Sequence, residues 1–396
     1  MDRRLIWMAA LAVAVMGVAI PRAHAADPAC TDTMNLPNPV FMSIGDTQVN
    51  LIKALGKQLR DAENVTLIWR ATGSCTNLDT LYTKANLSGT LSYIPANFDP
   101  KATPPTCTLA MPGVPADMAN SIVFLEGCPS MKPAAVTDVL GPVQSFVFVV
   151  PTASGQSAIT AEEAYFTFGF GQSGMVTPWT DEKQLFIRPV TKGTIISMAA
   201  SIKVPAGKWK GMSIDMSKDV ANQVAMAINP QTALGILGSE VYDQYRASLK
   251  ALAFRAFGQY HAYFPDSASS GFDRRNVRDG HYHMWSYTHW LYWTDGQGKA
   301  LNPLARRVAD LIAGNAVMPA PTFETADTIQ KVGLVPICAM KVQRTVEGGD
   351  FTPFSPDAPC GCYFDQLVTG KTNCTACTDD TPCQGGKCRR GYCEAK

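Results

Sequence analysis

The sequence predicts an α/β fold of two lobes with a disulfide-rich C-terminal appendage. Three apolar segments, 38–59, 64–82 and 183–202, each break on a short turn of Gly, Ser, Thr or Asp and continue as an amphipathic stretch. Alternating strands and helices are typical of α/β proteins. The pattern also suggests that the chain passes from one half of the fold to the other at the apolar strand 144–152 and returns within 249–265. A chain that passes between two halves twice favours a fold of two lobes over a single lobe.

The N-terminal residues 1–25 have the pattern of a signal peptide. Arg3 and Arg4 precede the apolar run 5–20, and small residues precede a cleavage site at Ala25. We therefore expect a soluble protein that is periplasmic or secreted to the cell surface after cleavage near Ala25.

Charge and cysteine content narrow the function classes. Cleavage would remove three of the 34 basic residues and one of the 33 acidic residues, which leaves 31 and 32. A nearly neutral chain without a basic stripe is not expected to bind nucleic acid. All 12 cysteines follow the signal peptide, and an even number of cysteines in an exported chain indicates disulfides.

The first lobe is expected over 38–148 and 262–341. Within it, 49–62 has the apolar spacing of a helix, and 303–315 is a helix that stops at a glycine. The apolar run 121–128 has the length of a strand.

The second lobe is expected over 149–261. The preceding run 144–152 suits a strand buried on both faces of a mainly parallel sheet. A helix should begin after Thr160, because Glu163 three residues later completes a capping box.

The remaining segment, 342–396, contains seven cysteines and almost no aliphatic residues, so disulfides must hold it together. One of the seven must pair outside the segment, and Cys338 is the nearest candidate. The upstream four would form two more bridges, but spacing does not decide connectivity. The expected disulfide cysteines are Cys30, Cys75, Cys107, Cys128, Cys338, Cys360, Cys362, Cys374, Cys377, Cys383, Cys388 and Cys393.

The strand–turn–helix junctions predict a cleft that grips a small anion. Each junction directs the unpaired N–H groups and the positive end of a helix toward one place. In the third junction, Arg188 offers a planar fork to an oxyanion, and Gly193 lets the backbone approach closely. Lys192 would either add a charge or fill the site. The alternative is an ordinary capped helix with two surface cations.

Other chemistries have less support. His281, His283 and His289, with Asp279 nearby, invite a zinc site, but they lie among aromatic residues and lack the HExxH spacing. We interpret them as packing residues and expect no metal and no cofactor. The chain has no G-x-S-x-G motif, which would indicate a nucleophilic serine. Glu162 suits the first turn of a helix better than a role in general acid–base catalysis. We therefore predict a protein that is not an enzyme.

The order of these junctions, followed by Ala-Leu-Gly-Ile-Leu-Gly at 233–238, resembles the periplasmic phosphate-binding protein branch of the type II solute-binding proteins of ABC transporters. The resemblance covers roughly 38–330. It implies the type II periplasmic-binding-protein fold, in which two lobes close on an oxyanion. The stretch 276–285 resembles exported proteins related to that branch, and 372–394 resembles cysteine-rich modules that end exported bacterial proteins.

The resemblance also implies the ligand groups. The ligand positions of the family correspond here to Asp46, Thr47, Ser74, Arg188, Gly193 and Thr194. The neighbouring residues Thr191 and Lys192 complete the expected ligand set. The chain departs from the family at two places. Lys192 stands where the family has Ser, and Ile122 stands where it has an acidic residue, with Glu126 the nearest carboxylate. These departures leave the identity of the ligand open.

The function expected from the sequence is capture of phosphate or a related small oxyanion for ABC-type uptake or sensing. Its partners would be an ABC permease or another exported protein that contacts the appendage. One alternative is a surface or interaction protein that keeps the scaffold without a ligand. The other is an exported hydrolase on a similar frame.

Overall fold

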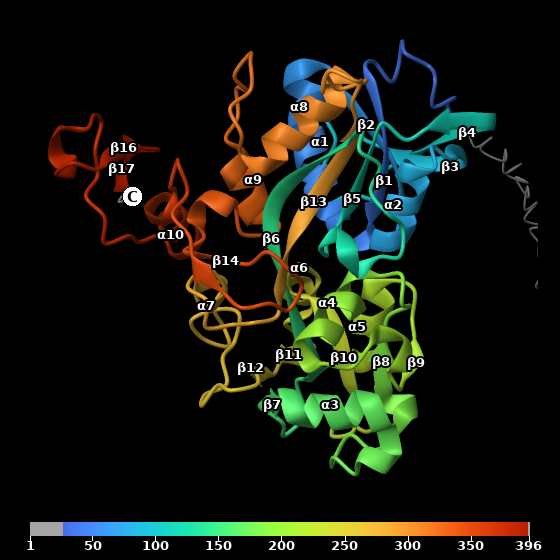
Figure 1. Cartoon of the computed structure of the whole chain (residues 1–396), viewed down its shortest axis with the longest axis vertical. Helices are drawn as coiled ribbons and strands as arrows, with labels where there is room; N and C mark the ends of the chain where they lie inside the picture. The colour runs from blue at the N-terminus through green and yellow to red at the C-terminus, as the bar shows by residue number, and fades with distance from the viewer. Residues whose placement is uncertain (1–26, 395–396) are drawn as a thin grey trace, which may run out of the picture.

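The computed structural model describes residues 27–394, so the expected signal peptide lies outside the described residues. Strands and helices form two lobes, one above the other, with the appendage at one side (Figure 1). The predicted α/β architecture is confirmed. No helix among residues 27–394 is long and apolar enough to span a membrane.

Lobe 1, the upper lobe in Figure 1, is built on a mixed sheet between helices. Helices α1 and α8 pack on one face of the sheet and α2 packs on the other. The strands are β1 (Pro39–Gly45), β2 (Thr66–Thr72), β3 (Asn86–Tyr93), β4 (Thr106–Pro115), β5 (Met118–Ser121) and β13 (Trp285–Trp293). The helices are η1 (Asp46–Gln48), α1 (Val49–Glu63), α2 (Ser74–Tyr82), η2 (Leu125–Gly127), α8 (Pro303–Ala313) and α9 (Thr325–Lys331).

Lobe 2, the lower lobe, has shorter strands. They are β7 (Ala158–Thr160), β8 (Leu185–Ile187), β9 (Met212–Ser213), β10 (Leu234–Gly238), β11 (Leu249–Ala251) and β12 (Ala253–Arg255). Its helices are α3 (Ala161–Phe170), η3 (Gly171–Gly174), η4 (Glu182–Gln184), α4 (Gly193–Ile202), η5 (Ala206–Lys208), α5 (Ser217–Ala225), α6 (Ser239–Tyr242) and η6 (Asp243–Tyr245). Thr160 caps α3 with the expected capping box to Glu163.

The long strand β6 (Val136–Pro151) joins the two lobes. Its first half pairs with β13 and its second half with β10 and β11, and all three pairings are antiparallel. The expectation of a mainly parallel sheet around 144–152 is therefore wrong at this strand, although its residues are buried as predicted. The run 121–128 is also not one strand, because β5 ends at Ser121 and η2 follows.

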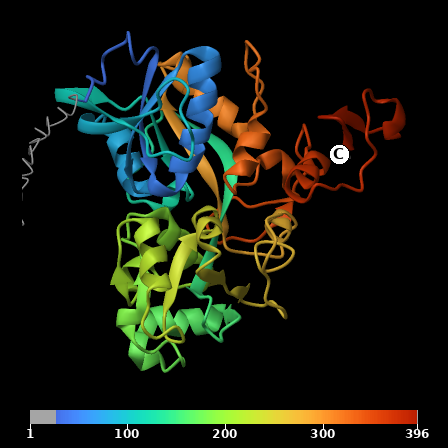
Figure 2. The ribbon, with the colours of Figure 1, turned by 180° about the vertical axis from the view of Figure 1, so that it is seen from behind.

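The appendage begins with a hairpin of β14 (Val342–Gln343) and β15 (Thr352–Pro353), near the short helix α7 (Arg275–Arg278) and the turn η7 (Ile337–Ala339). The helix α10 (Gly361–Thr369), the turn η8 (Thr381–Cys383) and the small hairpin β16 (Lys387–Arg389)–β17 (Tyr392–Glu394) follow. Seen from behind, the end of the appendage with β16 and β17 projects away from both lobes (Figure 2).

Six disulfides join all twelve cysteines. The pairs are Cys30–Cys107, Cys75–Cys128, Cys338–Cys360, Cys362–Cys374, Cys377–Cys388 and Cys383–Cys393. Cys338 thus links the appendage to the preceding segment. Six bridges and no unpaired cysteine are consistent with an oxidising, extracytoplasmic compartment.

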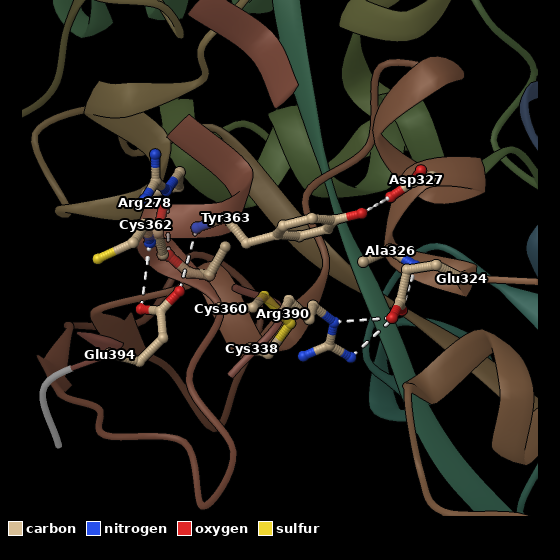
Figure 3. Close-up of a disulfide and its surroundings, with 12 residues drawn as sticks. Arg278, Glu324, Ala326, Asp327, Cys338, Cys360, Cys362, Tyr363, Arg390 and Glu394 are labelled. Atoms are coloured by element: carbon tan, nitrogen blue, oxygen red, sulfur yellow. Dashed lines mark hydrogen bonds and ion pairs between the residues drawn. A yellow bond between two sulfur atoms is a disulfide. The ribbon is translucent and has the colours of Figure 1, made fainter. Parts of the chain in front are cut away.

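Specific polar contacts fasten the appendage to lobe 1 around the Cys338–Cys360 bridge (Figure 3). Arg390 Nε lies 2.9 Å from Glu324 Oε2, just before α9, and the Tyr363 hydroxyl donates to Asp327 on α9. The Glu394 carboxylate accepts from the N–H groups of Cys362 and Tyr363, each at 3.1 Å. The Arg390 and Tyr363 contacts fix the appendage to the start of α9, and the Glu394 contacts join β17 to α10 within the appendage.

Candidate functional site

The lobes meet along a seam between the ends of β1, β2 and β5 in lobe 1 and the starts of α4 and α5 in lobe 2. The three predicted junctions all open here. The turn η1 follows Gly45, α2 follows Gly73 and α4 follows Lys192, and none of these residues caps its helix with a side chain. The first N–H groups of each element therefore have no side-chain acceptor, which suits an anion.

A buried ion pair between Asp46 and Arg188 crosses the seam. Arg188 Nη2 donates to Asp46 Oδ1 at 2.9 Å and to Oδ2 at 3.0 Å, and the N–H of Ser217, the first residue of α5, donates to Oδ2 at 2.9 Å. Burial by itself raises the pKa of Asp46, but Arg188 and the hydrogen bonds outweigh it, so the pKa lies below its usual range. The Asp46 carboxylate of lobe 1 thus accepts from the Arg188 guanidinium and the Ser217 N–H of lobe 2.

Lys192 and Thr191, which follow Arg188 in the chain and were predicted as ligand groups, both contact lobe 1 in the closed structure. Lys192 is only 5% exposed, and its Nζ donates to the Thr72 carbonyl at 3.1 Å and lies 3.1 Å from Asp215 Oδ1. Thr191 is exposed, and its carbonyl accepts from the Cys75 N–H at 3.2 Å. Thr191 thus presents a backbone acceptor to α2 in the closed arrangement, and a contact between its hydroxyl and a ligand stays a prediction.

Ser74, Gly193 and Ile122 lie in direct contact across the seam. The Ser74 hydroxyl accepts from the Ile122 N–H at 3.1 Å. A Cβ atom added at Gly193 would lie 2.3 Å from Ile122 Cγ1 and 2.6 Å from Ser74 Oγ. The lobes are therefore closed so tightly here that only glycine fits. Glu126, the nearest carboxylate in the sequence, is exposed.

Several buried polar atoms along the seam have no hydrogen-bond partner. They are Thr47 Oγ1, Asn120 Nδ2, Arg188 Nε and Thr194 Oγ1. Each of these groups can donate a hydrogen bond. A buried polar group without a partner costs about 1–3 kcal/mol, so this cluster is unfavourable unless something accepts from it. Asn120 was not predicted, although it lies at the end of β5, next to the end of β1.

A chain of amides and a carboxyl crosses the seam beside this cluster. The Gln48 side chain in lobe 1 donates to Gln144 on β6, and Gln144 donates to Glu240 Oε1 on α6 at 3.1 Å. Glu240 is only 3% exposed, and its Oε2 has no partner. Burial raises the pKa of Glu240 to about 8, and the charge of Asp243 adds to this.

This carboxyl predicts a pH dependence. Between pH 4.5 and 8 the folded chain keeps a proton on Glu240 that the unfolded chain has lost, so the free energy of unfolding falls as the pH rises. One group contributes a slope of up to about 1.4 kcal/mol per pH unit. We expect Glu240→Gln to gain stability relative to wild type from pH 5 to pH 8 in urea denaturation. Parallel pH profiles for the two proteins would contradict this.

The histidines do not share one site. His281 pairs with Asp279 at 2.7 Å on the surface, and His289 is buried against Asp138 at 2.9 Å. His283 lies against the appendage hairpin, where burial lowers its pKa to about 4. Their separate partners suit the structural interpretation better than a metal site.

Comparison with known proteins gave matches in structure alone. No protein-family model and no curated protein matched the chain. A putative phosphate ABC transporter substrate-binding protein with bound phosphate from Clostridium perfringens is similar over 76% of this chain and 100% of its own, with 12% identity and a TM-score of 0.51. An ABC-type phosphate transport receptor from Vibrio cholerae is similar over 75% of this chain and 99% of its own, with 14% identity and a TM-score of 0.46.

At such low identity these matches describe the fold and not the ligand. The chain therefore has the two-lobed fold of the type II periplasmic solute-binding proteins, with a disulfide-rich C-terminal appendage.

Proposed function

We propose that this exported protein binds phosphate or a related small oxyanion in the seam, for uptake through an ABC permease or for sensing. The observation that carries the proposal is the set of unpartnered donors on Thr47, Asn120, Arg188 and Thr194, next to helix starts that no side chain caps. A dehydrated oxyanion offers several acceptors at once and would satisfy such a set.

The Asp46–Arg188 pair supports the same proposal. A carboxylate already accepts from the Arg188 guanidinium and from the first N–H of α5, so these lobe 2 groups have the geometry of an oxyanion site. Asp46 belongs to lobe 1, and hinge opening would withdraw it from Arg188 and Ser217. An incoming anion would meet those donors on the open protein, and closure would then add the lobe 1 donors.

In this proposal, residues 38–148 with 262–341 form the first lobe and 149–261 the second, with the appendage at 342–396. The ligand groups are Thr47, Ser74, Arg188, Lys192, Gly193 and Thr194, with Asp46 as the gate. Export after cleavage near Ala25 belongs to the proposal as well.

The experiment is thermal melting of ligand-free protein, residues 26–396, against phosphate, sulfate, arsenate, phosphonates and small carboxylates. Ligand carried through purification is first removed by mild unfolding. A ligand at about 100 times its dissociation constant adds about 2.7 kcal/mol to the folded state, which raises the midpoint by several degrees. A flat response to the whole panel would contradict the proposal.

Thr194→Val gives a sharper test of the place of binding. The substitution removes a buried hydroxyl without a partner, so we expect stability to stay equal or rise, while oxyanion affinity falls about 10-fold or more. Thr167→Val is the matched control, because Thr167 Oγ1 on α3 is also buried without a partner but lies away from the seam. Equal affinities in the two variants would place the ligand elsewhere.

One observation favours a second function, a surface or interaction protein without a ligand. Asp46 neutralises Arg188, and Ile122 fills the space against Gly193, so the chain satisfies part of the seam with its own groups. The same melting panel decides between the two functions, because only the first predicts a raised midpoint.

A further inference from the structure

The appendage hairpin reaches the seam through Glu347, in the loop between β14 and β15. Glu347 Oε2 accepts from the Phe124 N–H at 3.1 Å and from the Ser286 hydroxyl at 2.9 Å. Glu347 Oε1 accepts from the Ser197 hydroxyl at 2.5 Å. Phe124 belongs to lobe 1, Ser197 lies on α4 of lobe 2, and Ser286 lies on β13. One carboxylate therefore bonds to both lobes at once.

The groups around this carboxylate form a built site. Phe124, Ser197 and Ser286 are 8%, 1% and 0% exposed. Burial raises the pKa of the Glu347 carboxyl above its usual range. The loop lies flat on α4, since a Cβ added at Gly348 would come within 3.0 Å of the Ala200 side chain. Without the carboxylate, the two serine hydroxyls would lose the acceptor that they share.

The rest of the hairpin is fastened on the outside of the seam. The Arg344 guanidinium lies 4.3 Å from the ring centre of Trp285 and 4.4 Å from that of Phe351, and these two rings stack at 5.3 Å. The Cys338–Cys360 disulfide closes the segment that contains the hairpin. The hairpin with Glu347 therefore lies inside the disulfide-closed segment that leads into the cysteine-rich module.

We propose that Glu347 acts as a latch. Its carboxylate, which the appendage supplies, accepts hydrogen bonds from both lobes and so holds them closed. Opening the lobes separates Phe124 from Ser197, so the carboxylate must give up at least one charge-assisted hydrogen bond. Each such bond shifts the open–closed equilibrium by about 10-fold or more. The latch couples the position of the appendage to access to the seam, and it does not require that the seam bind an oxyanion.

The test compares the open–closed equilibrium of two variants, Glu347→Gln and Asp350→Asn, in ligand-free protein of residues 26–396. The amide keeps the shape of Glu347 but lacks the charge and places an NH₂ group against a donor. Asp350 is an exposed residue of the same loop with no role in the latch, so Asp350→Asn is the matched control. We expect only Glu347→Gln to raise the radius of gyration in small-angle scattering. Peptides covering 121–128 and 193–202 should exchange amide hydrogens about 10-fold faster or more.

A second variant, Ser197→Ala with Ser286→Ala, removes the donors and leaves Glu347 in place, so it should open the lobes in the same direction. If Glu347→Gln behaves as Asp350→Asn in both measurements, the latch is overturned. Because both measurements are made without ligand, a failure of oxyanion binding is distinguishable from a failure of the latch.

Discussion

Replacing Asp46 by Ala should lower the free energy of unfolding by about 3–5 kcal/mol, because it leaves the charge of Arg188 buried without its partner. Arg188 is 1% exposed, and its remaining partners, the Ser217 hydroxyl and the Asp215 carbonyl, are neutral. Urea denaturation measures the loss. Asp61→Ala is the matched control, since Asp61 pairs with Lys57 at the surface, where such pairs contribute about 0–1 kcal/mol.

The same variant has a second expected result. Without Asp46, the Arg188 fork and the Ser217 N–H have no carboxylate to bind, so an added oxyanion should stabilise Asp46→Ala more than it stabilises wild type. If Asp46→Ala does not fold, the double variant Asp46→Ala/Arg188→Met tests the buried pair instead, because it should fold once both charges are removed and no buried ion remains. A loss no larger than that of Asp61→Ala would contradict the buried pair.

Removing the Cys75–Cys128 disulfide, as Cys75→Ala/Cys128→Ala, should cost about 4 kcal/mol, because the bridge closes a loop of 53 residues in the unfolded chain. The bridge also holds the start of α2, where Ser74 faces the seam, so oxyanion affinity should fall as well.

The control for this disulfide is Cys377→Ala/Cys388→Ala, which opens a loop of 11 residues inside the appendage. It should leave both the unfolding of the lobes and the oxyanion affinity close to wild type. Urea denaturation and the melting panel measure both variants. Equal losses in the two variants would show that the Cys75–Cys128 bridge has no special effect on the seam.

The sequence predicted the local elements of the seam well. Turn residues at Gly45, Gly73 and Lys192 begin η1, α2 and α4 where the pattern indicated, because turn chemistry acts over a few residues. The capping box at Thr160 succeeded for the same reason. An apolar run such as 144–152 predicts burial, but it does not distinguish parallel from antiparallel pairing, so the direction of β6 relative to its neighbours was missed.

The groups that the sequence did not predict depend on contacts between distant residues. Asp46 and Arg188 were both named as ligand groups, but their pairing spans 142 residues and appears only in the folded chain. Asn120 and Glu240 carry no local motif. The segment after Lys341 was expected to be a separate appendage, yet its hairpin places Glu347 against Phe124 and Ser197. Composition alone could not reveal that contact.

The central claim is that the seam binds a small oxyanion, and calorimetric titration of the ligand-free protein with phosphate, sulfate and arsenate tests it most directly. The account predicts one site per chain for at least one of these anions, with an affinity that Thr194→Val weakens about 10-fold or more and Thr167→Val leaves unchanged. The absence of binding for every anion, or binding that Thr194→Val does not weaken, would contradict it.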